Sequence, residues 1–245
     1  MTVVRLAYGG PPNALRKGLS QEPAPALLVS YYYIKGFLKL RDELVFRDWV
    51  MDSGAFSAHN SGKEIDLQEY IDFSLKMQEE DPTLAEVYGL DVIGDHEASL
   101  RNVEEMIRQG VNAIPTFHMG SPWEGLTELE KYPKIALGGM VRRSAKLKEK
   151  WLEQVFARIW PKRMHAFGIA AEPLLMKYPF HSCDASNWEL LPTAFGRWKA
   201  YDGALSVKGG EQNLRTEVDW YLKMEQRLQH RWRREMALLS KLETT

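Results

Sequence analysis

Strand-like apolar runs alternate with helix-like segments along most of this 245-residue chain, and this alternation constrains the fold more than any other feature. Parallel strands need long crossover connections, usually helices, so the pattern predicts βαβ units around a parallel sheet. Seven such runs precede residue 190, and an eighth near 203–207 would complete the set. The seven runs are 26–33, 43–52, 86–94, 111–119, 134–140, 163–170 and 180–186.

Eight strand–helix units and a length close to the roughly 250 residues of a (β/α)8 barrel predict a TIM-like barrel. We expect a single domain over 1–245, without a zinc subdomain, in which a charged helix at about 214–242 packs on the barrel. The alternative is an open doubly wound sheet. The sequence favours the barrel because it contains neither the GxGxxG nor the P-loop motif with which such sheets bind nucleotides.

Charge and cysteine content limit the class of protein. The 32 basic and 33 acidic residues give a net charge of -1, which argues against nucleic-acid binding over the whole surface but allows a local basic face. The single cysteine, Cys183, excludes an internal disulfide and a multi-cysteine zinc site, and it indicates a reducing compartment. Neither a signal peptide nor an apolar run of about 18 residues is evident, so we expect a cytoplasmic protein without a membrane partner.

Three carboxylates follow strand-like runs. Asp52 precedes “SGAFSA”, Asp91 lies in “GLDVIG” and Asp184 lies in “HSCDAS”. Taken singly, each is most simply explained as a helix cap or a loop acid. In a barrel, however, the carboxyl ends of the strands meet at one mouth, where catalytic residues lie. Paired carboxylates there suit chemistry at a glycosidic bond, since one can attack the anomeric carbon while the other carries a proton.

Glycines stand at the ends of two strand-like runs, and His118 ends a third. Gly138, Gly139 and Gly168 would let a flat ligand lie against the backbone, whose N–H and C=O groups could read its edge. The alternative is a tight turn between strand and helix. Phe56 could stack on a base, although an aromatic residue one turn beyond a strand more often belongs to the core.

Four segments resemble the queuine-type tRNA-guanine transglycosylases. “DSGAFS” (52–57) is similar to the “DSGGFQ” of that family, and “LGG” (137–139) to its “LGG” after a later strand. “HAFGIA” (165–170) resembles its “H-x-x-GIG”-like strand, and “HSCDAS” (181–186) falls where the family has the strand bearing its nucleophilic aspartate. The order and approximate spacing match from about residue 50 to residue 187.

The resemblance implies a barrel enzyme that exchanges guanine in a nucleic acid for a 7-deazaguanine base, with no cofactor or metal. Asp184 would be the nucleophile on C1′ of the target nucleotide, and Asp52 would move the proton on the departing or incoming base. Asp91 would hydrogen-bond the Watson–Crick edge of the base. The expected substrate-binding residues are Asp91, Ser53, Gly54, Phe56, His118, Gly138, Gly139 and Gly168.

The chain departs from the family in four respects. One cysteine cannot build the family's zinc site, and the chain is shorter. “MVRRS” after “LGG” lacks the glutamate that would suit an aminomethyl group on the base, and His118 stands where many members have glutamine. A neutral 7-cyano base fits such a pocket. The resemblance is therefore greatest to the compact phage and bacterial enzymes that insert 7-deazaguanines into DNA, with tRNA as the alternative substrate; if a phage encodes the protein, its compartment is the host cytoplasm.

Basic residues near the predicted mouth could contact phosphates, although the usual explanation of such clusters is a solvated helix face. The expected nucleic-acid contacts are Arg142, Arg143, Lys146, Arg197, Lys199 and Lys208.

Three other functions compete with base exchange. A metal-dependent barrel hydrolase could take ligands from His96, His118, His165, His181, Asp52 and Asp184. Against it, the sequence lacks HxH and HExxH motifs, and we place His165 and His181 at strand starts, on the opposite face of the barrel. A nucleoside hydrolase or glycosidase could use the same carboxylates but release the base to water. A catalytically silent subunit could bind nucleic acid or a partner enzyme.

Overall fold

A computed structural model describes residues 1–9, 12–195, 197–199, 205–208 and 214–241. Over 193–195, 197–199, 205–208 and 239–241 it describes the backbone alone. Nine strands of the described chain form one sheet in which every pairing is parallel. They are β1 (Val3–Tyr8), β2 (Ala26–Ser30), β3 (Trp49–Asp52), β4 (Leu84–Tyr88), β5 (Ala113–Ile114), β6 (Thr116–His118), β7 (Lys134–Gly138), β8 (Arg163–Ala166) and β9 (Ser182–Ala185).

The sheet closes on itself through a single residue. Its strand order is β5-β4-β3-β2-β1-β9-β8-β7-β6, so that β5 and β6 form its two edges. Only Pro115 separates these two strands, and proline lacks the N–H that a continuous ladder needs. The Pro115 carbonyl still accepts a hydrogen bond from the Ala136 N–H at 2.8 Å. β5 and β6 are thus one interrupted strand, and the predicted eight-stranded barrel is confirmed.

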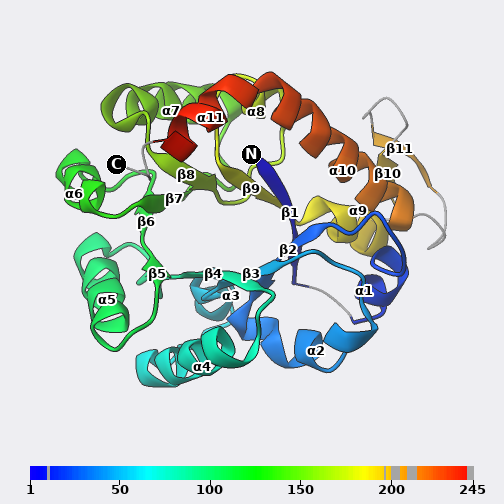
Figure 1. Ribbon diagram of the computed structural model, residues 1–245, viewed down its shortest axis with the longest axis horizontal. Helices are drawn as coiled ribbons and strands as arrows, with labels where there is room; N and C mark the ends of the chain where they lie inside the picture. Colours follow the sequence, from blue (N-terminus) through cyan, green and yellow to red (C-terminus); the bar gives the residue numbers. More distant parts are fainter. Residues whose placement is uncertain (10–11, 196, 200–204, 209–213, 242–245) are drawn as a thin grey trace.

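Helices follow the strands and surround them (Figure 1). Three of them begin with a side-chain cap: the side chains of Asp66, Asp95 and Ser144 accept backbone N–H groups of the first turns of α4 (Leu67–Glu80), α5 (His96–Arg108) and α7 (Ala145–Ile159). The helices are α1 (Pro12–Gly18), α2 (Ile34–Leu38), α3 (Ala55–Asn60), α4 (Leu67–Glu80), α5 (His96–Arg108), α6 (Trp123–Glu128), α7 (Ala145–Ile159), α8 (Glu172–Leu175), α9 (Asn187–Phe195), α10 (Leu214–Arg231) and α11 (Arg233–Lys241), with short 3-10 turns η1 (Tyr31–Tyr33), η2 (Arg41–Glu43) and η3 (Leu129–Lys131).

Alternate strand residues face two different cores, because side chains on a strand point to opposite sides. One set packs against the helices in a large apolar cluster. The other set fills the barrel interior with a small cluster around Leu28, Val50, Tyr88 and Ala136. Two residues further along β2, β3 and β7, the same alternation places Ser30, Asp52 and Gly138 on the interior face at the carboxyl end. The fold itself therefore delivers polar groups to the mouth.

Three sequence-based assignments need correction. The eighth barrel strand is β1, not the run at 203–207: β11 (Leu205–Lys208) pairs antiparallel with β10 (Arg197–Lys199) in a separate two-stranded sheet. The end of the predicted strand 26–33 is the 3-10 turn η1.

The charged C-terminal segment, predicted as one helix over 214–242, is two helices, α10 and α11, separated at Trp232. α10 lies along β1, where the buried Glu225 carboxylate accepts the Val4 N–H at 2.8 Å. It therefore covers the strand that sequence analysis missed.

Candidate active site

The carboxyl ends of the strands bring together four of the residues that sequence analysis singled out. Asp52 is the last residue of β3 and His118 the last of β6; Asp184 is the third residue of β9, and Asp91 lies three residues beyond β4. The negative charges of Asp91 and Asp184 both act on Asp52, so the three carboxylates share one mouth. This convergence is what a parallel barrel predicts for acids that follow its strands.

Asp52 is half-buried, and its environment keeps a proton available at neutral pH. Burial first, and then the charges of Asp91 and Asp184, raise the pKa of Asp52 to about 7. The Gly54 N–H donates to Asp52 Oδ2 at 3.2 Å, which acts in the opposite direction. A carboxyl group with this pKa can both donate and accept a proton near pH 7.

The turn after β3 explains why “DSG” stands there. Gly54 has a φ of 78°, in the left-handed region, and a Cβ atom on it would lie 2.4 Å from Ser30 Oγ. Ser53 is buried, and its hydroxyl accepts the Ala55 N–H at 3.4 Å. Phe56 in α3 is 52% exposed, so it belongs to the surface near the mouth and not to the core.

Asp91 and His118 form a pair across the mouth. Asp91 Oδ2 lies 3.3 Å from His118 Nε2. Burial opposes the charged imidazole, but the hydrogen bond and the charge of Asp91 outweigh it and raise the pKa of His118. A Cβ atom on Gly138 would lie 2.7 Å from the His118 ring, so glycine leaves the room that this ring occupies. Asp91 Oδ1 is buried without a hydrogen-bond partner among the described residues, and it can accept one from a ligand.

Asp184 is buried and held by one of its two oxygens. Its Oδ1 accepts the Gly168 N–H at 2.8 Å and lies 3.4 Å from His165 Nε2. No described group donates a hydrogen bond to Oδ2. Sequence analysis expected the Gly168 backbone to contact a flat ligand, but in the structure its N–H donates to Asp184.

His165 does not lie on the opposite face, as predicted, but inside the barrel beneath Asp184. It is the third residue of β8 and fully buried, with its ring centroid 5.0 Å from that of Tyr88 and 4.6 Å from that of Phe167. The prediction failed because a side chain midway along a short strand can reach the carboxyl end. His181, by contrast, precedes β9.

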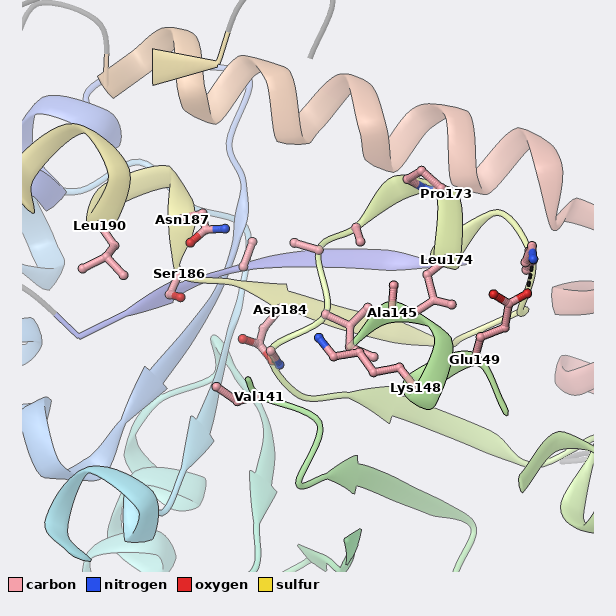
Figure 2. A pocket seen from close by; sticks show the side chains of 16 residues that line it. Val141, Ala145, Lys148, Glu149, Pro173, Leu174, Asp184, Ser186, Asn187 and Leu190 are labelled. Atoms are coloured by element: carbon pink, nitrogen blue, oxygen red, sulfur yellow. Dashed lines mark hydrogen bonds and ion pairs between the residues drawn. The ribbon is translucent and has the colours of Figure 1, made fainter. Parts of the chain in front are cut away.

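A cavity of about 680 Å³ opens beside Asp184, between the start of α7 and the loops after β8 and β9. Its lining is mostly apolar, with Val141, Leu174 and Leu190 among the side chains around it (Figure 2). Lys148 extends from α7 toward Asp184 in the same view. Lys148 makes no ion pair with any described residue. The sequence places it in the basic segment 142–150 beside the predicted mouth, but it was not among the expected phosphate contacts.

The predicted phosphate contacts occupy two places. Arg142, Arg143 and Lys146 are exposed between β7 and the first turn of α7, beside this cavity. Arg142 has a φ of 63°, an unusual conformation for a residue with a side chain. Gly139, also exposed, precedes them. The other three residues are on β10 and β11, and their side chains fall outside the described part of the chain; they are Arg197, Lys199 and Lys208.

Ser30 is a mouth residue that sequence analysis missed. It pairs in register with Asp52, and its buried hydroxyl has no hydrogen-bond partner among the described groups. Its position as the last polar residue of a strand-like run was the available signal.

Within the described residues, no three His, Cys, Asp or Glu side chains are grouped closely enough to hold a metal ion. The histidines and aspartates named for a metal-dependent hydrolase therefore form no such group there. Among the described helices, none combines the length and apolarity needed to cross a membrane.

The fold and the mouth define the chain as a (β/α)8-barrel protein. No family model matches its sequence, and no curated protein is similar to it. Among solved structures, a candidate fructose-1,6-biphosphate aldolase from Coccidioides immitis aligns over 100% of this chain and 92% of its own, with 11% identity and a TM-score of 0.49. A likeness of this extent carries no inference about the reaction.

Proposed function

We propose that this protein is a base-exchange transglycosylase that replaces guanine in a polynucleotide by a 7-deazaguanine such as 7-cyano-7-deazaguanine. DNA is the favoured polynucleotide and tRNA the alternative. One observation carries the proposal: a carboxyl group with a pKa near 7, Asp52, shares a barrel mouth with a carboxylate, Asp184, that is held by one oxygen only. The resemblance of “DSGAFS” and “HSCDAS” to the transglycosylases supports the same assignment.

The two carboxyl groups suit a two-step exchange. Asp184 Oδ2 attacks C1′ of the target nucleotide, an ester bond forms, and the bond from C1′ to N9 breaks while Asp52 gives its proton to the departing guanine. The incoming base then loses its N9 proton to Asp52 and attacks C1′. The ester bond breaks, and Asp184 and Asp52 return to their starting states.

The remaining mouth residues suit recognition of a guanine-like base. The N1–H and amino group on its Watson–Crick edge are donors, and Asp91 offers a buried acceptor oxygen without a described partner. His118 and Asp91 fix each other's orientation, and Gly138 leaves space beside them. The exposed Phe56 is available for stacking on the base.

A polynucleotide substrate accounts for the cations around the cavity. Arg142, Arg143 and Lys146 are exposed beside it, and Lys148 is directed into it toward Asp184 (Figure 2). Arginine and lysine in such positions bind phosphates without reading sequence. Because the carboxylates are recessed in the mouth, the target nucleotide would have to leave its stack to reach them, as in other enzymes that act on a base.

The experiment is to incubate the purified protein with 7-cyano-7-deazaguanine and either DNA or unmodified tRNA, digest the polymer and weigh the nucleosides by mass spectrometry. We expect the deazaguanine nucleoside from DNA with the wild-type protein and none with Asp184→Asn. The matched control is Asp42→Asn, because the Asp42 side chain is 91% exposed and lies away from the mouth, in η2.

Each outcome has a defined meaning. Incorporation into tRNA alone would retain the chemistry and replace DNA as the substrate. Incorporation into neither polymer, with wild-type protein that is folded, would refute base exchange. Full activity of Asp184→Asn would refute the covalent mechanism.

A further inference from the structure

We propose that His165 is a positioning residue that holds the Asp184 carboxylate through a directed chain of hydrogen bonds. The chain runs inside the barrel, through Glu86, Lys134, Ser182, His165 and Asp184. Its role in catalysis rests on the proposed function, in which Asp184 is the nucleophile. The existence and direction of these hydrogen bonds do not depend on the proposed function.

The chain begins with a buried ion pair. Lys134, the first residue of β7, places Nζ 2.6 Å from both carboxylate oxygens of Glu86 in β4. Burial opposes the charge on Glu86, but Lys134 outweighs it and lowers the pKa of Glu86 to about 2. Burial lowers the pKa of Lys134 to about 8, so the ammonium group keeps its proton at neutral pH. An ammonium group can only donate, which sets the direction of the next contact.

Ser182 transmits that direction to the histidine. Its hydroxyl oxygen accepts from Lys134 Nζ at 3.3 Å and lies 2.9 Å from His165 Nδ1. The hydroxyl hydrogen has two possible acceptors, His165 Nδ1 and the Tyr88 hydroxyl oxygen. We assign it to Nδ1, which lies 2.9 Å away. Nδ1 is then the acceptor of the ring, and the ring proton resides on Nε2.

His165 ends the chain at Asp184. Burial lowers the pKa of His165, so the ring is neutral at pH 7 and carries one proton. Nε2 faces Asp184 Oδ1 at 3.4 Å, and it makes no hydrogen bond with any described residue, Asp184 included. That distance is long for a hydrogen bond, but such contacts often shorten when an active site binds its substrate. A bare Nε2 lone pair against a carboxylate oxygen would be repulsive, which favours the same tautomer.

The consequence is a carboxylate with one oxygen fixed and one free. Asp184 Oδ1 faces two N–H donors, Nε2 of His165 and the backbone of Gly168. Oδ2 is then presented to the mouth in a single orientation. Rigid placement of a nucleophile accelerates a reaction because the reacting atoms already lie in line. A purely structural role for the same chain would stabilise the barrel without affecting turnover.

The first test needs no activity. Nitrogen NMR of the imidazole ring reports which nitrogen carries the proton. We expect neutral His165 with its proton on Nε2 at pH 7, and a mixture of tautomers in Ser182→Ala. A proton on Nδ1 would refute the proposed direction of the hydrogen bonds. That tautomer would arise if the Ser182 hydroxyl donated its hydrogen to its other neighbour, the Tyr88 hydroxyl.

The second test measures exchange kinetics. His165→Phe keeps an aromatic ring between Tyr88 and Phe167 but removes the donor, and we expect kcat to fall about 100-fold at unchanged KM. His165→Gln, which retains an N–H donor, should recover part of that loss. His230→Gln, at an exposed position on α10, serves as the control.

Two failures are distinguishable. If the wild-type protein performs no exchange, the proposed function is refuted. The NMR experiment still shows whether the hydrogen bonds from Lys134 to Asp184 run in the proposed direction. If the wild-type protein is active and His165→Phe, shown to be folded by its thermal midpoint, has the same kcat, the positioning role is refuted.

Discussion

The two ends of the barrel interior differ in whether their acidic side chains have cationic partners. At the amino end, acids are matched by cations: Glu86 binds Lys134, and Asp48 binds Arg5 at 2.6 Å. At the carboxyl end, three aspartates face one another, and no described lysine or arginine forms an ion pair with them. Burial raises the pKa of both Glu86 and Asp52, yet the pKa of Glu86 is about 2 and that of Asp52 about 7. The charge of the neighbouring groups, Lys134 for Glu86 and the other aspartates for Asp52, decides whether the pKa is lowered or raised.

The two ends differ in the role that their acids have: those at the amino end support the fold, and those at the mouth are the ones for which we propose a catalytic role. A buried acid beside a cation stays ionised and supports the fold, whereas like charges gathered in a mouth destabilise the folded state and shift pKa values toward neutrality. Such an arrangement is retained where chemistry needs a proton near pH 7. The same residue type therefore has opposite consequences at the two ends.

The largest effect is expected from breaking the Glu86–Lys134 pair at the amino end. Lys134→Met leaves the Glu86 charge buried without its partner, and we expect the free energy of unfolding to fall by about 3–5 kcal/mol. Urea denaturation measures it. The double variant Lys134→Met with Glu86→Gln should recover at least half of the loss; a single variant as stable as wild type would contradict the contrast between the two ends.

Removing a mouth acid should have the reverse effect on stability. Asp52→Asn relieves repulsion and desolvation, so we expect a gain of about 1–3 kcal/mol at pH 8 together with loss of exchange. The folded-state pKa of Asp52 lies above its unfolded value of 3.8, so its protonation stabilises the fold at low pH and this contribution is lost as pH rises through 7.

The stability difference should therefore depend on pH. Between pH 5 and 7 it should move in favour of Asp52→Asn by up to about 1.4 kcal/mol per pH unit. Denaturation at several pH values measures this slope, with Asp42→Asn as the control. A difference that is independent of pH would show that Asp52 is ionised throughout that range.

Sequence patterns predicted the parts of the molecule that depend on local alternation. Asp52, Asp91 and Asp184 were found because each follows a strand-like run, and closed barrels gather such residues. β1 was missed because Arg5 interrupts its apolar character, and the partner that makes this charge tolerable, Asp48, is distant in sequence. His165 was misplaced for a related reason: its contacts come from neighbouring strands and no local pattern reports them.

A smaller effect tests the pair that Asp91 and His118 form at the mouth. In Asp91→Asn, His118 loses the hydrogen bond and the charge that offset its burial, so the pKa of His118 should fall. Proton NMR titration of the imidazole measures it. KM for the incoming base should rise about 10-fold, since the variant also loses an acceptor for the base. An unchanged His118 titration would contradict the pairing.

The smallest effect is expected at Arg142, which is exposed beside the cavity. Arg142→Gly removes a side chain from a left-handed conformation, so we expect stability to rise by about 1 kcal/mol, while the slope of log affinity against log salt for DNA decreases in magnitude by about 1. Arg143→Gly, without the positive φ, is the matched control for strain. An unchanged salt slope in Arg142→Gly would remove Arg142 from the phosphate contacts.

The most direct measurement of the central claim is mass mapping of the protein after an acid quench of its reaction with a guanine-containing oligonucleotide. Base exchange through Asp184 predicts a nucleotide ester on the peptide that contains Asp184, lost on addition of 7-cyano-7-deazaguanine and absent from Asp184→Asn. An adduct on another residue, or guanine release with no adduct on any peptide, would contradict it.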